Sequence, residues 1–193
     1  RDSKAYDMLV QAESGVVSLT GSPNAPAKVG ISIADISSGF YAYSSILTAL
    51  IQRASTGKGE RIDISMLEAT LATMGWVVSN YLVAGREPVP FGNENFTASP
   101  SGTFRTGNGL LNIAANKQEQ WEAVTDELGV PELKTDPRFQ RRDARKTNRR
   151  ALTPLLEAKL REKTTGHWVE ALNARGVPSG AIIFLGAAIR HDD

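Results

Sequence analysis

The sequence contains no cysteine and only two histidines, His167 and His191. The absence of cysteine excludes disulfides, thiolate metal sites and a cysteine nucleophile. It also fits a reducing compartment, so we expect a cytoplasmic protein. A tight metal cluster built from histidine and cysteine is not available either, and we predict no metal cofactor.

Strong net charge and long apolar runs are also lacking. The formal net charge is +1 over 193 residues, which gives no overall field to attract nucleic acid or a membrane surface. No apolar run approaches the roughly 20 residues that a membrane-spanning helix needs. The chain opens on Arg1 rather than methionine and stops at Asp193, just after a new element starts near Ala187. We therefore expect a fragment of a longer protein.

Two familiar catalytic motifs are absent. There is no G-x-S-x-G stretch, so a serine hydrolase has no support. Gly57-Lys58-Gly59 lacks the upstream glycine of a phosphate-binding loop and has no serine or threonine after its lysine. The chemistry must therefore depend on carboxylates, tyrosines, amides and backbone groups.

Hydrophobic periodicity divides the chain into helices, short strands and one loop rich in proline and glycine. Apolar residues at three- and four-residue steps predict helices, and alternation predicts strands. Gly57 is expected to end the longest helix, and Gly107-Asn108-Gly109 predicts a hairpin turn. We expect helices at 3–13, 36–55, 66–83, 117–128, 145–163 and 166–175, strands at 61–64, 103–106, 110–114 and 177–185, and a loop at 84–102.

Asp35 is the strongest candidate for a chemical role. It stands one residue before the longest predicted helix. As an N-cap it would contribute about 1 kcal/mol to stability, and spacing alone favours this interpretation. The alternative is a nucleophile held at the helix N-terminus, where the helix dipole and backbone N–H groups stabilise negative charge. A carboxylate is anionic at neutral pH and needs no general base to attack a thioester.

Two further features have both a functional and a structural interpretation. Lys4 and Tyr6 place an ammonium and a phenol two residues apart at a helix start, although the residues alone favour a solvated lysine and a core tyrosine. The stretch 138–150 holds seven basic residues against one acidic residue, Asp143. It could bind polyanions, but a solvated helix face is favoured because Phe139 is the only aromatic residue among them.

Taken together, ordered segments over nearly the whole chain resemble the class III CoA-transferase family. This family includes formyl-CoA transferase, carnitine CoA-transferase and the related α-methylacyl-CoA racemases. The segment around Asp35 and the segment from Thr56 to Ala69 are the most specific. The matching stretches are 4–12, 14–21, 33–39, 53–69, 91–93, 99–102, 128–129, 135–139 and 176–178, together with Trp121.

The resemblance implies an α/β fold, with part of a Rossmann-like large domain and an inserted small α+β domain. Two subunits of the family interlock, so it also implies a homodimer. On this basis residues 1–80 belong to the large domain and 81–99 form a linker and active-site loop. Residues 100–175 form the small domain, and 176–193 begin the return to the large domain. The family's N-terminal half and C-terminal end would lie outside this chain.

The resemblance also implies chemistry. At the position of Asp35, the transferases have an aspartate that attacks an acyl-CoA thioester. A mixed anhydride and then an aspartyl-CoA thioester follow, before a carboxylic acid accepts the CoA. Lys4 and Tyr6 would lie near the CoA. The substrate loop would include Gly92, Asn93, Glu94 and Asn95, and we predict that it closes over the site. In formyl-CoA transferase this loop carries a run of glycines, which Glu94–Ser99 lacks.

The racemase branch of the family is the first alternative. It uses a histidine where this chain has Tyr6, and a phenol with an ordinary pKa of about 10 is a poor base beside an imidazole at about 6.5. A racemase glutamate would fall near Gln118, which cannot ionise. These differences favour a transferase. A non-catalytic fragment or binding module is the second alternative.

Overall fold

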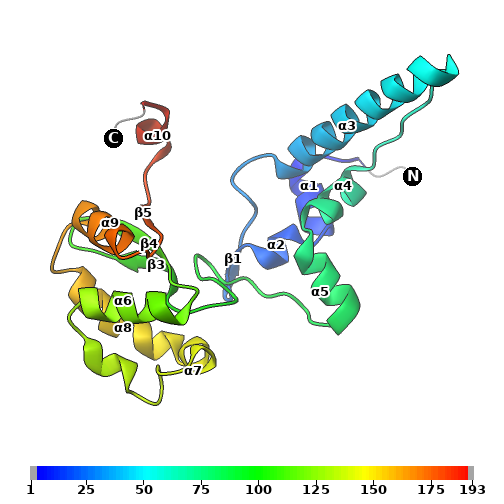
Figure 1. The fold of residues 1–193 in the computed structure, drawn as a ribbon. Coiled ribbons are helices and arrows are strands. Elements are labelled where there is room, and N and C mark those ends of the chain that lie inside the picture. The colour runs from blue at the N-terminus through cyan, green and yellow to red at the C-terminus, as the bar shows by residue number, and fades with distance from the viewer. Residues whose placement is uncertain (1–3, 191–193) are drawn as a thin grey trace. The chain divides into compact units, whose positions relative to one another are not determined.

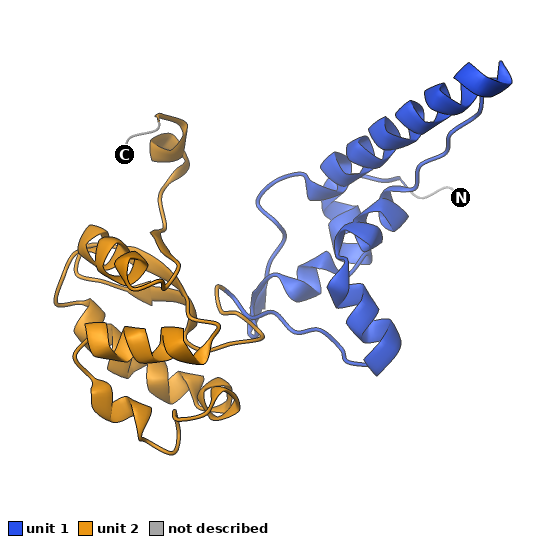
Figure 2. Ribbon diagram, in the orientation of Figure 1, with its two compact units in different colours: residues 1–92 blue, residues 93–193 orange. Residues whose placement is uncertain are grey.

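The computed structural model describes residues 4–190, and the chain divides into two compact units, residues 1–92 and 93–193 (Figure 2). Helices joined by loops make up the first unit, with one short strand pair (Figure 1). It comprises α1 (Asp7–Glu13), α2 (Val16–Leu19), α3 (Ile33–Thr56), α4 (Met66–Thr73) and α5 (Trp76–Ala84), with a two-residue antiparallel ladder of β1 (Gly21–Ser22) and β2 (Ala25–Pro26).

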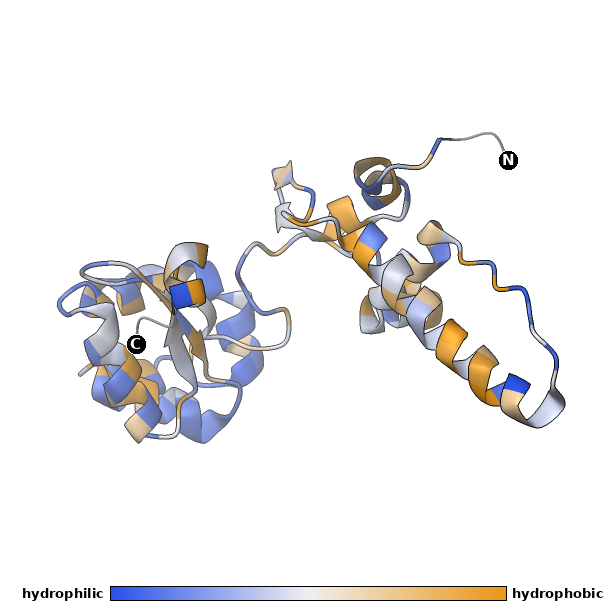
Figure 3. Ribbon diagram, turned by 90° about the horizontal axis from the view of Figure 1, so that it is seen from above, coloured by the Kyte–Doolittle hydropathy of each residue, from blue (hydrophilic) through white to orange (hydrophobic). Residues whose placement is uncertain are grey.

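The 24-residue helix α3 is the longest helix of the first unit and packs against α1 and α4. It ends as predicted at Gly57, which has a left-handed φ of 70° and whose N–H donates a hydrogen bond to the Arg53 carbonyl. The predicted apolar stripe of α3 stays exposed within the described residues, and Figure 3 shows hydrophobic residues along this helix. Its exposed members include Ile36, Phe40, Tyr43, Leu47 and Leu50.

Two predictions in the first unit are wrong. The expected helix 66–83 is interrupted at Gly75, whose φ of 51° and ψ of −114° are incompatible with a continuous helix. The expected strand 61–64 is not formed, because an extended segment needs a hydrogen-bonded neighbour and the described residues supply none there. Instead, Arg61 and Asp63 form an exposed ion pair.

The second unit is a three-stranded antiparallel sheet covered by helices. Strands β3 (Ser101–Arg105), β4 (Leu110–Ala114) and β5 (Ser179–Ala181) lie in the order β3-β4-β5. The predicted hairpin is confirmed, with Arg105 opposite Leu110. A Cβ on Gly107 would lie only 2.7 Å from the Lys163 carbonyl oxygen, so the turn requires glycine there. The helical segments are α6 (Gln118–Glu127), η1 (Pro131–Lys134), α7 (Arg142–Thr147), α8 (Arg149–Leu160), α9 (Thr165–Ala174) and α10 (Leu185–Arg190).

The second unit has its own hydrophobic core. Helices α8 and α9 pack against the sheet, and Trp121 on α6 and Trp168 on α9 are both buried. The Trp168 indole N–H donates to the Leu160 carbonyl over 2.7 Å. In the first unit, by contrast, Trp76 is 63% exposed. The other core side chains include Phe104, Leu111, Ile113, Val124, Phe139, Leu152, Leu156, Leu160, Leu172 and Val177.

Two element boundaries in the second unit differ from the prediction. The expected helix 145–163 is two helices, because the backbone of Asn148 (φ −99°, ψ 18°) leaves the helical conformation and separates α7 from α8. The expected strand 177–185 pairs only at Ser179–Ala181, and α10 follows. The mixture of helix and sheet is confirmed, whereas the domain boundaries at 80, 99 and 175, the Rossmann-like domain and the interlocked dimer stay predictions. No helix among residues 4–190 is long and apolar enough to cross a membrane.

Candidate functional site

Asp35 lies in the first turn of α3, not at its N-cap. The helix begins at Ile33, with Ser32 as the N-cap residue, because the Ile36 N–H already bonds to the Ser32 carbonyl over 3.0 Å. The predicted N-cap role of Asp35 is therefore wrong. A negative charge in the first turn still lies in the positive end of the helix dipole.

The Asp35 carboxylate is exposed and has no hydrogen bond or ion pair to any residue that the structure describes. Its neighbours on the same turn, Ala34 and Ser37, are buried against the rest of the unit. The backbone of this turn is thus packed, while the carboxylate faces solvent and stays available to a ligand. This combination suits a nucleophile.

The Asp7 carboxylate on α1 is hydrogen-bonded to the start of α3. The Ala34 N–H donates to Asp7 Oδ1 over 2.9 Å. Tyr6 precedes Asp7 and Asp35 follows Ala34, so this bond brings the two predicted site segments together. The Tyr6 side chain is 70% exposed, so the interpretation of Tyr6 as a core tyrosine is wrong. Lys4 is also exposed, and contacts of either residue with CoA stay predictions.

The predicted substrate loop is shared between the units. Gly92 ends the first unit, and its N–H donates to the Gly21 carbonyl over 2.6 Å. Asn93, Glu94 and Asn95 begin the second unit, where the Asn95 N–H bonds to the Ser101 carbonyl over 2.9 Å. Closure of this loop over Asp35 stays a prediction.

Arginines from the basic stretch hold the loop to the second unit. Arg149 donates to the Glu94 carboxylate over 3.0 Å and to the Asn95 carbonyl over 2.9 Å. Arg142 donates to the Thr97 carbonyl over 3.1 Å. Arg145 donates to the Ser99 carbonyl over 2.9 Å. The prediction of a solvated basic face is wrong for the buried Arg145 and the half-buried Arg149, whereas Arg142 stays exposed. An irregular loop has backbone carbonyls that need donors, and these arginines supply them.

Arg145 is the most buried of these residues and lies against the Trp121 ring, 4.9 Å from its centroid. Burial, with the nearby charge of Arg142, lowers the pKa of its guanidinium. It also donates to the Gln118 side-chain oxygen over 3.1 Å. Gln118 therefore has a structural partner at the position where the racemases would place a glutamate.

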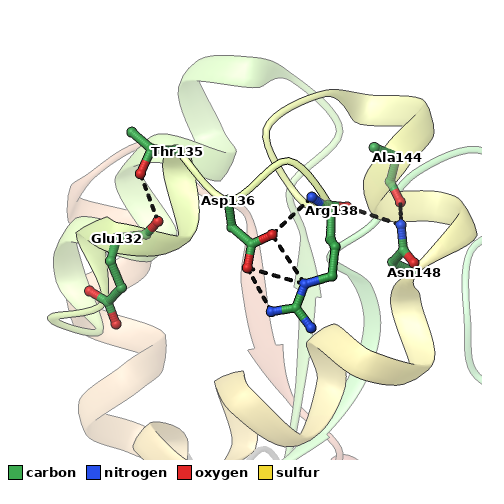
Figure 4. A network of polar contacts seen from close by, with 6 residues as sticks. All are labelled: Glu132, Thr135, Asp136, Arg138, Ala144 and Asn148. Atoms are coloured by element: carbon green, nitrogen blue, oxygen red, sulfur yellow. Dashed lines mark hydrogen bonds and ion pairs between the residues drawn. The ribbon is translucent and has the colours of Figure 1, made fainter.

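A second ionic contact lies in the segment after η1 (Figure 4). The Arg138 guanidinium donates two hydrogen bonds to the Asp136 carboxylate. Nη2 lies 2.6 Å from Oδ2, and Nε lies 3.1 Å from Oδ1. These hydrogen bonds lower the pKa of Asp136. The Asn148 amide donates to the Arg138 carbonyl over 3.2 Å and joins this segment to the end of α7. Arg138, like Arg149, is thus engaged within the unit.

The described residues form no metal cluster, and the hollow beside the predicted substrate loop is small. Among residues 4–190, no cluster of three or more histidine, aspartate or glutamate side chains could hold a metal ion. A small hollow beside Glu94 and Arg149 has a volume of about 30 Å³. That volume is far below the roughly 300–1,000 Å³ of typical ligand pockets. The hollow therefore suits a side-chain contact better than a cofactor.

The model of CoA-transferase family III matches residues 1–193. The chain belongs to CoA-transferase family III. This confirms the family that the ordered segments predicted. The Asp35 turn and the arginine-held loop are therefore features of a member of this family.

Relatives and a solved structure agree with this assignment. An acetyl-CoA:oxalate CoA-transferase of Acetobacter aceti is 34% identical over 186 residues, covering 95% of this chain and 48% of the relative. A succinyl-CoA:glutarate CoA-transferase of Mus musculus is 32% identical over 193 residues, covering 97% of this chain and 44% of the relative. A CaiB/BaiF family protein from Brucella suis superposes with a TM-score of 0.87 at 34% identity, covering 96% of this chain and 50% of that one. The chain thus spans about half the length of the relatives it matches.

Sequence reasoning missed Asp7, Gln11 and Arg149. Asp7 and Gln11 lie within the matching segment 4–12, four residues apart on one helix face. This spacing of two polar residues is a usable signal, since such side chains meet on a helix. Nothing in the sequence indicated their contacts with residues 29–34, which depend on tertiary packing.

Proposed function

We propose that this chain supplies the nucleophile of a CoA-transferase, which moves CoA from an acyl-CoA thioester to a carboxylic acid. Membership of CoA-transferase family III supports this proposal. The observation that carries it is the Asp35 carboxylate, exposed in the first turn of α3 and unengaged by any described residue. A carboxylate in that position is charged, accessible and held on a packed turn.

In the first step, an Asp35 oxygen attacks the thioester carbonyl carbon of the donor. The carbon–sulfur bond breaks, CoA leaves as a thiolate, and a mixed anhydride remains on Asp35. The N-terminus of α3 favours negative charge near this turn. The thiolate then attacks the Asp35 side-chain carbonyl carbon and expels the donor's acid as a carboxylate, leaving an aspartyl-CoA thioester.

The second half of the cycle reverses these steps with another acid. The acceptor carboxylate attacks the aspartyl-CoA thioester, releasing the thiolate and forming a new anhydride. Attack of the thiolate on the acceptor's acyl carbon gives the new acyl-CoA and restores the Asp35 carboxylate. No net proton is gained or lost. The covalent route divides one exchange into easier steps.

Other parts of the predicted site have supporting roles in this proposal. Lys4 and Tyr6 lie beside the CoA, and the loop Gly92–Asn95 keeps water from the anhydride. The catalytic protein is an interlocked homodimer in the cytoplasm. The two relatives named above pair acetyl-CoA with oxalate and succinyl-CoA with glutarate, so a short acyl donor and a small acid are the first substrates to test.

Mass spectrometry of the protein at its full encoded length tests the proposal. The protein is mixed briefly with acetyl-CoA or succinyl-CoA, with and without hydroxylamine, and then digested. We expect an acyl or CoA adduct on the peptide that contains Asp35, and hydroxylamine should remove it. Asp35→Asn should abolish the adduct and the transfer to oxalate or glutarate.

Asp63→Asn is the matched control, because Asp63 is an exposed aspartate in the same unit that pairs only with Arg61 among the described residues. It should keep the adduct and the transfer rate. Transfer at the wild-type rate in Asp35→Asn would contradict the proposal. Exchange of the donor's α-hydrogen with deuterated solvent, without an adduct, would indicate a racemase instead.

A further inference from the structure

Gln11 is a fully buried polar side chain on α1. Its Nε2 donates to Asp7 Oδ2 over 2.7 Å and to the Ile31 carbonyl over 3.2 Å. Its Oε1 accepts the Val29 N–H over 2.9 Å. Burying an amide costs free energy unless it is hydrogen-bonded, so these contacts fix the orientation of Gln11.

Asp7 completes the same network. One of its oxygens accepts from Gln11, and the other accepts the Ala34 N–H over 2.9 Å. The N–H groups in the first turn of a helix need an acceptor, which is usually the side chain of the N-cap residue. Here Ser32 makes no such side-chain bond. Asp7, from another helix, supplies the acceptor for α3.

Residues at the start of α3 have the spacing of another way to cap the helix. Ser32 and Asp35 have the spacing of a capping box, in which the N-cap hydroxyl and the carboxylate three residues later satisfy the helix end between them. Neither bond of that box is formed among the described residues. Because Asp7 caps the helix from outside, the Asp35 carboxylate is not used for capping.

We propose that Asp7 and Gln11 are positioning residues that hold the Asp35 turn in place and leave its carboxylate available for acyl transfer. This inference rests on the proposed function of Asp35. The network ties residues 29–34 to α1 at the Val29 N–H, the Ile31 carbonyl and the Ala34 N–H. A misplacement of about 1 Å costs on the order of 100-fold in rate, so losing these ties slows the attack.

Two substitutions break the network in different ways. Asp7→Asn places an amide N–H₂ against one of two donors, Gln11 Nε2 or the Ala34 N–H, and removes a charge. Gln11→Met removes the ties to residues 29 and 31 with no change in charge. Glu13→Gln is the matched control, because it neutralises an exposed carboxylate on the same helix. Asp7→Asn combined with Ser32→Asp restores a cap to α3 without restoring the tie to α1.

The measured quantities are the single-turnover rate of adduct formation on Asp35 with acetyl-CoA or succinyl-CoA, the melting temperature and amide hydrogen exchange in residues 29–36. We expect Asp7→Asn and Gln11→Met to slow acylation by about 10- to 100-fold and to speed exchange in that segment. Glu13→Gln should match wild type. The double variant should regain melting temperature but not the acylation rate.

Different outcomes separate this proposal from the proposed function. If Asp35 of the wild type forms no adduct, both are overturned. If the wild type forms the adduct and Asp7→Asn and Gln11→Met form it at the same rate, only the positioning role is overturned. Recovery of the full rate in the double variant would also overturn it, because the network would then act only as a helix cap. Should Asp7→Asn fail to fold, Gln11→Met carries the same comparison.

Discussion

The Arg149 guanidinium and the Glu94 carboxylate form an ion pair of 3.0 Å that joins the start of α8 to the loop before β3. The same guanidinium donates to the Asn95 carbonyl, so one side chain binds both a carboxylate and a backbone carbonyl of the loop. The planar fork of arginine suits such paired contacts, and lysine cannot reproduce them. The predicted substrate loop is therefore anchored within its own unit.

Replacing Arg149 by lysine should loosen this loop. We expect faster amide exchange in residues 94–99 and a loss of about 1–3 kcal/mol in the free energy of unfolding, because loop carbonyls lose their donor. Hydrogen exchange and chemical denaturation measure the two effects. Arg150→Lys, at the exposed neighbouring position, should change neither. Equal exchange in both variants would show that other contacts hold the loop.

Gly102 permits the close approach of this loop to β3. Its φ is 150°, and a Cβ there would lie 2.9 Å from the Asn93 carbonyl oxygen and 3.1 Å from Glu94 Cα. Gly102→Ala should destabilise the protein by about 1–3 kcal/mol through strain and displacement of the loop. Gly180→Ala is the control on β5, where an added Cβ meets open space. Denaturation midpoints that fall equally in the two variants would contradict the steric explanation.

The Asp136–Arg138 contact predicts a specific response to acid. Hydrogen bonds from Arg138 lower the pKa of Asp136 below its ordinary 3.8 in the folded state. The contact therefore stabilises the fold above about pH 4 and stops doing so as the pH falls through the lowered pKa.

Asp136→Asn should thus be less stable than wild type at neutral pH, and the difference should shrink in acid. Urea denaturation at pH 7 and at pH 3 measures it. The control is Asp143→Asn, because Asp143 is highly exposed and its ion pair with Lys146 is 4.0 Å long. A difference between Asp136→Asn and wild type that grows in acid would contradict the assigned direction.

Local signals in the sequence predicted local features of the fold. Gly57 ends α3 in a left-handed conformation that glycine adopts easily. Gly107-Asn108-Gly109 forms the predicted hairpin turn, although the Lys163 carbonyl beside Gly107 could not be foreseen from the local sequence. The strand expected at 61–64 failed because strand formation needs a partner elsewhere. Gly75 interrupts a helix whose hydrophobic pattern runs through it.

In the candidate site, too, local features were predicted and contacts between distant residues were missed. Asp35 was found because it lies beside a helix start, and the family resemblance gave it a role. Asp7 was missed because its partner is the Ala34 N–H, 27 residues away along the chain. The loop contacts of Arg142, Arg145 and Arg149 were missed for the same reason: a run of basic residues indicates charge but not which backbone carbonyls lie nearby.

The placement of the three tryptophans gives the protein an optical label for each unit. Trp121 and Trp168 are buried in the second unit, whereas Trp76 is largely exposed in the first. An aqueous quencher such as iodide should reach Trp76 and spare the other two. Any molecule that settles on α5 would protect Trp76 and shift its emission to shorter wavelength. Trp76 fluorescence can therefore report when a molecule binds α5 in the first unit, which carries Asp35. In the same spectrum, Trp121 and Trp168 report on the second unit.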